Sequence, residues 1–215
     1  VLTGDGGDEI FGGYDHWYLP LAESERLPNR GIKYHVLRVA DDALHTPWLR
    51  SKRVAADEAR CWPDVLDRHL QRAYRFSRDA RQKLLNQDSV YALNGGLCSH
   101  SVSGLNRAFW FDMQWYLPGD ILVKVDRASM AVGLETRSPL LDPDVVEFML
   151  SLPARMKVSR GVCKRIFRKA FQQDWPASLR TRSKLGFGVP EDVWLRRADV
   201  RALLGDVLLN SQSAI

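Results

Sequence analysis

The sequence predicts a mainly α-helical fold, and three observations support this. Apolar residues recur every three to four positions through most of the chain, as they do on helices that bury one face. Glycine and proline separate these stretches from one another. The strand signal is almost confined to residues 1–2, Val-Leu, which are expected to end a buried strand before a glycine-rich turn. No repeat or linker divides the chain, so a single domain over residues 1–215 is predicted.

The first helices expected have clear apolar stripes. Residues 32–45 have helical apolar spacing and end before Pro47. A second helix is expected over residues 63–77, and a basic one over residues 79–94. Leu105–Leu117 is rich in aromatic side chains, which are interpreted as core in preference to a stacking surface for a base.

The second half is expected to begin a new helix after Pro118-Gly119-Asp120, with Asp120 as its N-cap. Asp142 and Pro143 predict the start of a further helix over residues 143–151. Three more helices are predicted, over residues 162–173, 190–197 and 199–208.

The composition excludes several classes of protein. Among 215 residues, 45% are hydrophobic and 27% charged, which excludes a disordered or collagen-like chain. The net charge of +5 is too small to predict nucleic-acid binding, although it suits a phosphate-bearing ligand. Three widely spaced cysteines predict no metal-thiolate site and a reduced, cytoplasmic location. No membrane span or secretory leader is predicted, and the opening without Met suggests a processed or truncated product.

The glycine-rich acidic turn TGDGGDE over residues 3–9 is the strongest local feature. Glycines let a backbone approach a phosphate closely, and carboxylates bind Mg²⁺, which bridges them to phosphate oxygens. The turn is therefore interpreted as a nucleotide and metal site, with Asp8 as the metal ligand. An ordinary exposed turn remains the alternative, and the spacing of an EF-hand loop is absent.

Three later features carry charges that could serve an anion. Lys164 lies in a basic helix and could reach phosphate, although a solvated basic face is the alternative. Lys184 precedes a glycine-containing turn and could also reach an anion. Four charges in the apolar stretch over residues 124–137 predict an ion-pair network: Asp126, Arg127, Glu135 and Arg137. The five histidines are interpreted as surface or core residues.

Taken together, these motifs resemble the C-terminal synthetase domain of glutamine-hydrolysing asparagine synthetases. Three stretches carry the resemblance: VLTGDGGDEIFGGY at residues 1–14, YLPGDILVKVDRASMAVGLETRSPLLD at residues 116–142, and the later sites at Lys164 and at residues 184–190. The resemblance implies the helical C-terminal part of an α/β adenine nucleotide α-hydrolase-like (ATP-pyrophosphatase) domain.

The resemblance also implies the chemistry. ATP adenylates the side chain of aspartate, and ammonia from glutamine then displaces AMP to give asparagine. Asp8 would bind Mg²⁺, and Lys164 would contact the phosphates. Thr3, Gly4 and Asp5 would line the nucleotide and acyl-adenylate site, with Gly6 and Lys184 beside the nucleotide; Lys164 and Asp5 are the expected catalytic residues. A homodimer is left open.

Departures from the family pattern limit what the chain is expected to do alone. Thr3 stands where serine is usual, and Asp5 where a longer glutamate is common. No SGGxDS pyrophosphate loop and no N-terminal glutaminase cysteine occur, and the family places both upstream. The isolated chain is therefore expected to be inactive and to need upstream glutaminase and pyrophosphate-loop regions. Two alternatives remain open. One is the same adenylation chemistry on another acceptor (β-lactam, lasso-peptide or surface-sugar amidation), and the other is a non-catalytic domain.

Overall fold

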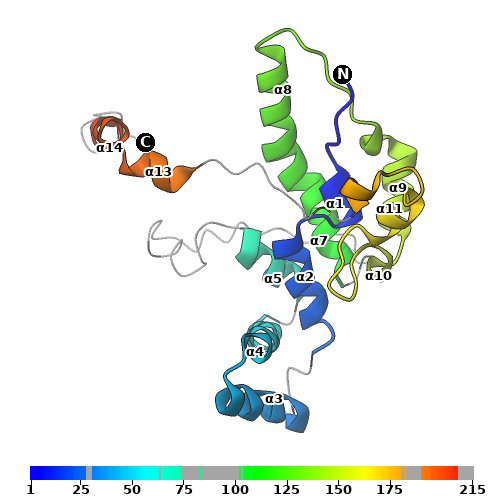
Figure 1. The fold of residues 1–215 in the computed structure, drawn as a ribbon, viewed down its shortest axis with the longest axis vertical. Coiled ribbons are helices and arrows are strands. Elements are labelled where there is room, and N and C mark those ends of the chain that lie inside the picture. Colours follow the sequence, from blue (N-terminus) through cyan, green and yellow to red (C-terminus); the bar gives the residue numbers. More distant parts are fainter. Residues whose placement is uncertain are drawn as a thin grey trace. The chain divides into compact units, whose positions relative to one another are not determined.

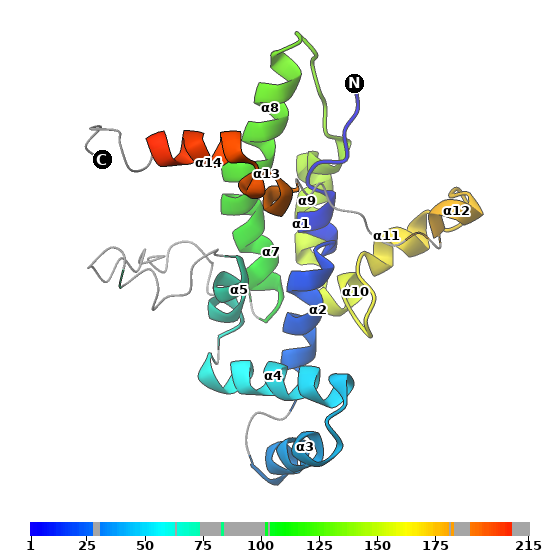
Figure 2. The same cartoon turned by 60° about the vertical axis from the view of Figure 1, so that its left-hand side comes forward.

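The computed structural model describes residues 1–27, 31–62, 64–73, 83, 102, 104–180, 182 and 190–207. The chain divides into two compact units, Val1–Asp174 and Trp175–Ile215. Helices dominate the described residues of both units (Figures 1 and 2). The prediction of a mainly α-helical fragment is therefore confirmed, whereas the single domain over residues 1–215 stays a prediction.

The first unit contains most of the helices. Their bounds are α1 Gly7–Phe11, α2 Asp15–Ser24, α3 Gly31–Leu44, α4 Pro47–Cys61, α5 Val65–Ala73, α7 Asn106–Phe111, η1 Asp112–Ile121, α8 Leu122–Met130, η2 Pro139–Leu141, α9 Pro143–Ser151, α10 Ala154–Lys157 and α11 Arg165–Ala170. The second unit contains α12 Ala177–Arg180, α13 Glu191–Arg196 and α14 Ala198–Gly205. In that unit α13 packs against α14.

Several predicted elements agree with the structure. Helix α3 is present where expected, although Ile32, Val36 and Val39 of its apolar stripe are exposed. Helix α9 begins at the expected cap, where the Asp142 carboxylate accepts a hydrogen bond from Asp144 N at 3.0 Å. Helix α13 lies within the range expected for it, and α14 begins at Ala198, one residue before its expected range. The helix expected over residues 63–77 is present as α5, while the one over residues 79–94 lies outside the described residues, except for residue 83.

The prediction that the chain restarts at Pro118 is wrong. Helices α7, η1 and α8 follow one another without interruption, and Pro118 and Asp120 lie inside the π-helical segment η1 (Figure 1). Asp120 pairs with Lys124 at 3.1 Å and caps nothing. The wider turns of a π-helix change the hydrogen-bond register, which lets the helix continue past a residue that lacks an N–H.

The strand expected at residues 1–2 is also absent as a buried element. Leu2 forms one parallel bridge with Arg137, and its side chain is exposed, as is that of Val1. The basic helix expected from residue 162 begins at Arg165, because Ser159 and Val162 first pair in an antiparallel bridge.

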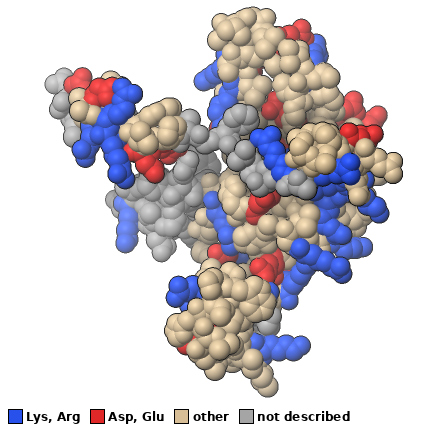
Figure 3. Space-filling view, in the orientation of Figure 1, with Lys and Arg blue, Asp and Glu red and all other residues tan. Residues whose placement is uncertain are grey.

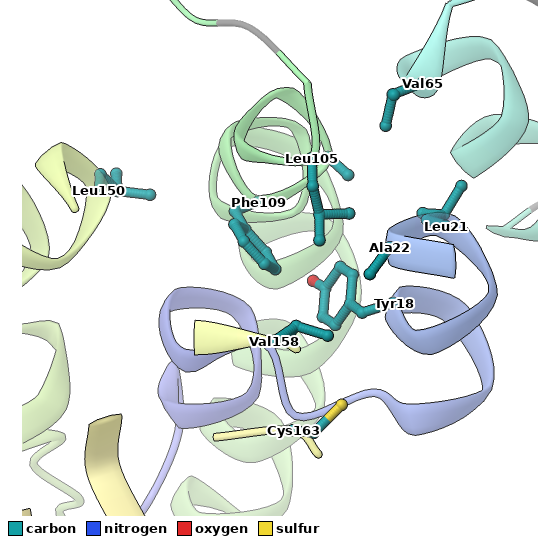
Figure 4. Close-up of a cluster of buried hydrophobic side chains, with 10 residues drawn as sticks. Tyr18, Leu21, Ala22, Val65, Leu105, Phe109, Leu150, Val158 and Cys163 are labelled. Carbon is teal, nitrogen blue, oxygen red and sulfur yellow. The ribbon is translucent and has the colours of Figure 1, made fainter. Parts of the chain in front are cut away.

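The core of the first unit lies between α2, α5, α7 and the segment after α10. Figure 4 shows Tyr18 and Phe109 facing one another, with Leu21 and Leu105 beside them and Val158 below. A smaller cluster joins Ile10 and Phe11 of α1 to Met149 of α9. The aromatic stretch is therefore core over α7, as expected, although Trp115 of η1 is exposed.

A buried polar network crosses this core. Asp112 accepts hydrogen bonds from the Tyr18 hydroxyl and lies 2.7 Å from His69 Nε2, and all three side chains are fully buried. Buried polar groups keep their free-energy cost low by pairing in this way. His69 is thus a core histidine, while His16, His35 and His45 are exposed; both agree with the sequence interpretation, and His100 lies outside the described residues.

Lys157 is an unexpected member of the core. Its side chain is fully buried, its Nζ donates to the Met149 carbonyl at 2.9 Å, and it lies 4.4 Å from the centre of the Phe109 ring. Burial lowers the pKa of Lys157 from 10.5 to about 8, because the charged form loses its hydration.

This burial predicts a pH-dependent stability. The unfolded chain keeps the Lys157 proton up to pH 10.5, whereas the folded chain releases it above about pH 8. The cost of the buried charge is therefore complete below pH 8 and is relieved as the pH rises toward 10.5. We expect the unfolding free energy of the native chain, relative to Lys157→Met, to increase over this interval by on the order of 3 kcal/mol.

Urea unfolding of both proteins across this pH interval checks the expectation. Comparing the two proteins cancels the other groups that titrate there. A difference in unfolding free energy that stays constant, or that falls as the pH rises, would contradict it.

Candidate functional site

Two sequence motifs that are distant in the chain meet at the first three residues. Thr3 N donates to the Arg137 carbonyl at 2.8 Å, and Arg137 N donates to the Val1 carbonyl at 2.9 Å. The segment that follows, η2, then packs under the glycine-rich turn, since Leu141 lies beside Gly6. The motif over residues 1–14 is therefore held in place by the motif over residues 116–142.

The glycines of the turn have different surroundings. A Cβ at Gly6 would lie 2.0 Å from Leu141 Cδ2, and one at Gly12 would lie 2.4 Å from Val158 Cγ2. Both have left-handed backbones, with φ of 81° and 69°. Only at Gly4 in this turn would a Cβ meet no atom within 4 Å. Gly6 and Gly12 thus serve close packing and turning of the chain, and Gly4 has the open space that approach to a ligand requires.

Asp8 of α1 and Lys164 before α11 form the centre of the site. The Lys164 Nζ lies 2.5 Å from Asp8 Oδ1, and each side chain is between a quarter and a third exposed. Lys164 has a left-handed backbone with φ of 53°, which is uncommon for a side-chain-bearing residue, and it is the N-cap of α11. The structure therefore brings together the two groups that the sequence assigned to metal and phosphate.

Gly13 completes the floor under this pair. A Cβ there would lie 1.9 Å from Asp8 Oδ1 and 2.3 Å from Lys164 Cε. A side chain at this position would displace the carboxylate and the lysine from their present contact.

The neighbouring acid, Glu9, has a different environment from Asp8. Glu9 is buried and accepts a hydrogen bond from the Tyr14 hydroxyl at 2.6 Å. Burial raises the pKa of the Glu9 carboxyl, and burial next to Glu9 raises the pKa of the Tyr14 hydroxyl. Tyr14 also contacts Tyr116 of the central motif, with ring centres 5.7 Å apart. The Glu9–Tyr14 hydrogen bond and the Tyr14–Tyr116 ring contact therefore join the two motifs on their buried side, while Asp8 contacts Lys164.

Asp5 and Thr3 lie on the other side of the turn, with Ser138. The Thr3 hydroxyl donates to Asp5 Oδ2 at 2.7 Å and lies 2.7 Å from Ser138 Oγ. Ser138 was not a candidate from the sequence, because a lone serine in an apolar motif has no distinctive signal.

Of the ion-pair network expected over residues 124–137, the Glu135–Arg137 pair is present, and no ion pair of Asp126 or Arg127 is seen among the described residues. Asp126 and Arg127 are exposed on α8, a helix with no buried residue. Glu135 and Arg137 pair with one another at 2.5 Å, and both are about three-quarters exposed. Exposed charges of this kind have no need of buried partners.

The remaining basic candidates separate into three groups. Arg165 and Lys169 are exposed, and Figure 3 shows Lys and Arg side chains gathered over the region of α10 and α11. Arg165 and Lys169 therefore fit the alternative interpretation of a solvated basic face. Lys164, which pairs with Asp8, and the buried Lys157 do not. Lys184 lies outside the described residues.

No group of three or more His, Cys, Asp or Glu side chains suited to a metal ion occurs among the described residues. Asp8 by itself fits one mode of Mg²⁺ binding. Mg²⁺ is often held by one or two carboxylates while phosphate oxygens and waters supply its other ligands.

These observations define a class of protein: a helical chain in which a glycine-rich turn presents a carboxylate to a lysine from a distant helix, as in sites for metal-bound phosphates. Over residues 1–215 the sequence matches the asparagine synthase family, and the chain belongs to that family.

Individual relatives agree. The chain is 32% identical over 221 residues to "Asparagine synthetase (glutamine-hydrolyzing) 1" of Bacillus subtilis (strain 168), an alignment that covers 99% of this chain and 34% of that protein. It is 26% identical over 193 residues to "Asparagine synthetase (glutamine-hydrolyzing) 3" of the same organism, covering 85% of this chain and 25% of that protein.

The chain thus spans about a third of the length of the first of these relatives. No solved structure matches it. Among the described residues, no helix is both long and apolar enough to cross a membrane.

Proposed function

We propose that the chain is the helical part of an ATP-dependent synthetase that converts aspartate to asparagine. In the first step an oxygen of the aspartate side chain attacks the α-phosphorus of ATP, and pyrophosphate leaves. In the second step ammonia attacks the activated carbonyl carbon, and AMP leaves with the electrons of the broken C–O bond. The observation that carries the proposal is the contact between Asp8 and Lys164, which come from the two family motifs expected to serve the phosphates.

Each group at the site has a role in this proposal. Asp8 holds Mg²⁺, and the ion when bound neutralises charge on the departing pyrophosphate. Lys164 supplies a positive charge to the same phosphates, and a partly exposed ammonium can turn from Asp8 toward them. Thr3, Gly4 and Asp5 line the acyl-adenylate, where Gly4 leaves space for close approach. Gly6 and Lys184 are assigned to the nucleotide on family resemblance alone.

Exposed apolar surface supports partners from the rest of a longer enzyme. The side chains of Val1 and Leu2 are exposed, although Leu2 pairs with Arg137 through its backbone. Met130 and Val132, at the end of α8, are exposed as well. Exposed apolar groups of this kind are typical of interaction surfaces. We propose that the pyrophosphate-loop region packs here, that the glutaminase region supplies ammonia, and that the enzyme is cytoplasmic. A homodimer stays open.

Pyrophosphate release tests the proposal. We expect the product of the complete coding sequence to release pyrophosphate when given ATP, Mg²⁺ and aspartate, and to form asparagine when ammonium is added. The 215-residue chain by itself is expected to release none. Release dependent on another carboxylic acid would favour the alternative acceptors. Absence of release with every acid tested would favour a non-catalytic domain, and turnover by the isolated chain would refute the need for upstream regions.

A further inference from the structure

The hydroxyl of Ser138 takes part in a small hydrogen-bonded cluster beside the proposed site. Ser138 Oγ lies 2.7 Å from Thr3 Oγ1 and 3.4 Å from Asp5 Oδ2, so its single hydroxyl hydrogen is donated to the nearer Thr3 oxygen. Thr3 Oγ1 donates to the same carboxylate oxygen at 2.7 Å. Two hydroxyls from segments more than 130 residues apart thus form a chain of hydrogen bonds that ends on one oxygen of Asp5.

The backbone on both sides of Ser138 is firmly placed. On one side, Arg137 exchanges hydrogen bonds with Thr3 and Val1. On the other, Leu140 and Leu141 pack under the turn, at Gly7 and Gly6. The position of the Ser138 hydroxyl is therefore set by the fold, which is what a group needs if it is to orient another.

We infer that Ser138 is a positioning residue for Asp5, an inference that rests on the proposed function. Ser138 donates to the Thr3 hydroxyl, which in turn donates to Oδ2, and this chain of hydrogen bonds fixes the direction of the second Asp5 oxygen. Ser138 acts through Asp5 and has no contact with the Asp8 and Lys164 pair among its hydrogen bonds in the structure.

This role predicts a division between kinetic constants. In the complete enzyme we expect Ser138→Ala to lower kcat for asparagine formation about tenfold, as loss of one orienting hydrogen bond would. The dependence on Mg²⁺ should stay unchanged, because the proposed metal ligand is Asp8, which Ser138 does not contact. Ser138→Thr keeps the hydroxyl and should restore most of the rate.

Two controls distinguish positioning from a general effect on folding. In the background of Asp5→Ala, the change Ser138→Ala should cause no further loss, since the group that it orients is gone. Ser151→Ala is a matched control, because the exposed Ser151 hydroxyl donates to the Phe148 carbonyl of its own helix, α9. It should leave kcat unchanged.

A measurement without turnover separates this inference from the proposed function. The ¹³C resonance of the Asp5 carboxyl, recorded on the 215-residue chain at neutral pH, should move in Ser138→Ala and return in Ser138→Thr. An unmoved resonance, or an equal loss of kcat with and without Asp5, would overturn the role of Ser138. Failure of the complete enzyme to use aspartate would instead refute the proposed function, and the resonance would still test the Ser138 contact.

Discussion

Replacement of Lys164 by alanine is expected to lower pyrophosphate release by the complete enzyme roughly 10²–10³-fold, the cost of losing one electrostatic contact in a transition state. The structure places the ammonium of Lys164 against Asp8, so the change removes the positive charge nearest to the proposed metal ligand. Thermal unfolding of both proteins checks that the loss of activity is not a loss of fold, since the Asp8–Lys164 pair is mostly buried and its removal has a stability cost of its own. Alanine also has the same difficulty as lysine with the left-handed backbone at this position.

Lys169→Ala is the matched control for this experiment. Lys169 is an exposed lysine on the same helix, α11, and it has the same charge. Its replacement should leave the rate of pyrophosphate release within about twofold, since exposed substitutions away from a site have small effects. Equal losses in Lys164→Ala and Lys169→Ala would mean that general positive charge is at work, and the specific role of Lys164 would have to be abandoned.

Gly12→Ala is expected to destabilise the chain by about 2–4 kcal/mol, measured by urea or thermal unfolding. A left-handed backbone costs a residue with a side chain about 1–2 kcal/mol, and overpacking costs a further 1–3 kcal/mol. Both costs apply at Gly12, since its φ is 69° and its Cβ would lie 2.4 Å from Val158 Cγ2 and 3.1 Å from Phe109.

Gly4→Ala provides the contrast within the same motif. A Cβ at Gly4 meets nothing within 4 Å, and its backbone is outside the left-handed region. Its unfolding free energy should change by no more than about 0.5 kcal/mol. Similar destabilisation by both changes would show that the glycines of this turn are not distinguished by the packing described above.

The basic segment around Lys164 shows how far the sequence alone can predict a site. Lys157, Lys164 and Lys169 look alike in the sequence, yet one is buried over Phe109, one pairs with Asp8 and one is exposed. Family resemblance singled out Lys164 correctly as a partner in space for Asp8. Nothing local distinguishes Lys157, because its burial depends on packing against Phe109 of α7, which is distant in the chain.

The same reasoning applies to the acids and to the helices. Asp8 and Glu9 are adjacent, and only the hydroxyl of Tyr14 and the surrounding core decide that Glu9 is buried. Helix α9 could be predicted because its cap is local. Helix α4 had a local signal too, since Thr46 accepts from Leu49 N at 3.2 Å and Pro47 follows it, but Pro47 was used only to end the preceding helix. Ser138 has no local signal, because its partners Thr3 and Asp5 are more than 130 residues away in the sequence.

The most direct test of the account is a crystal structure of the complete enzyme with Mg²⁺ and a non-hydrolysable ATP analogue. We expect an Asp8 oxygen about 2.1 Å from the metal ion and the Lys164 ammonium about 3 Å from a phosphate oxygen of the same nucleotide. A structure in which Asp8 and Lys164 stay paired with one another while the triphosphate binds elsewhere would contradict the account.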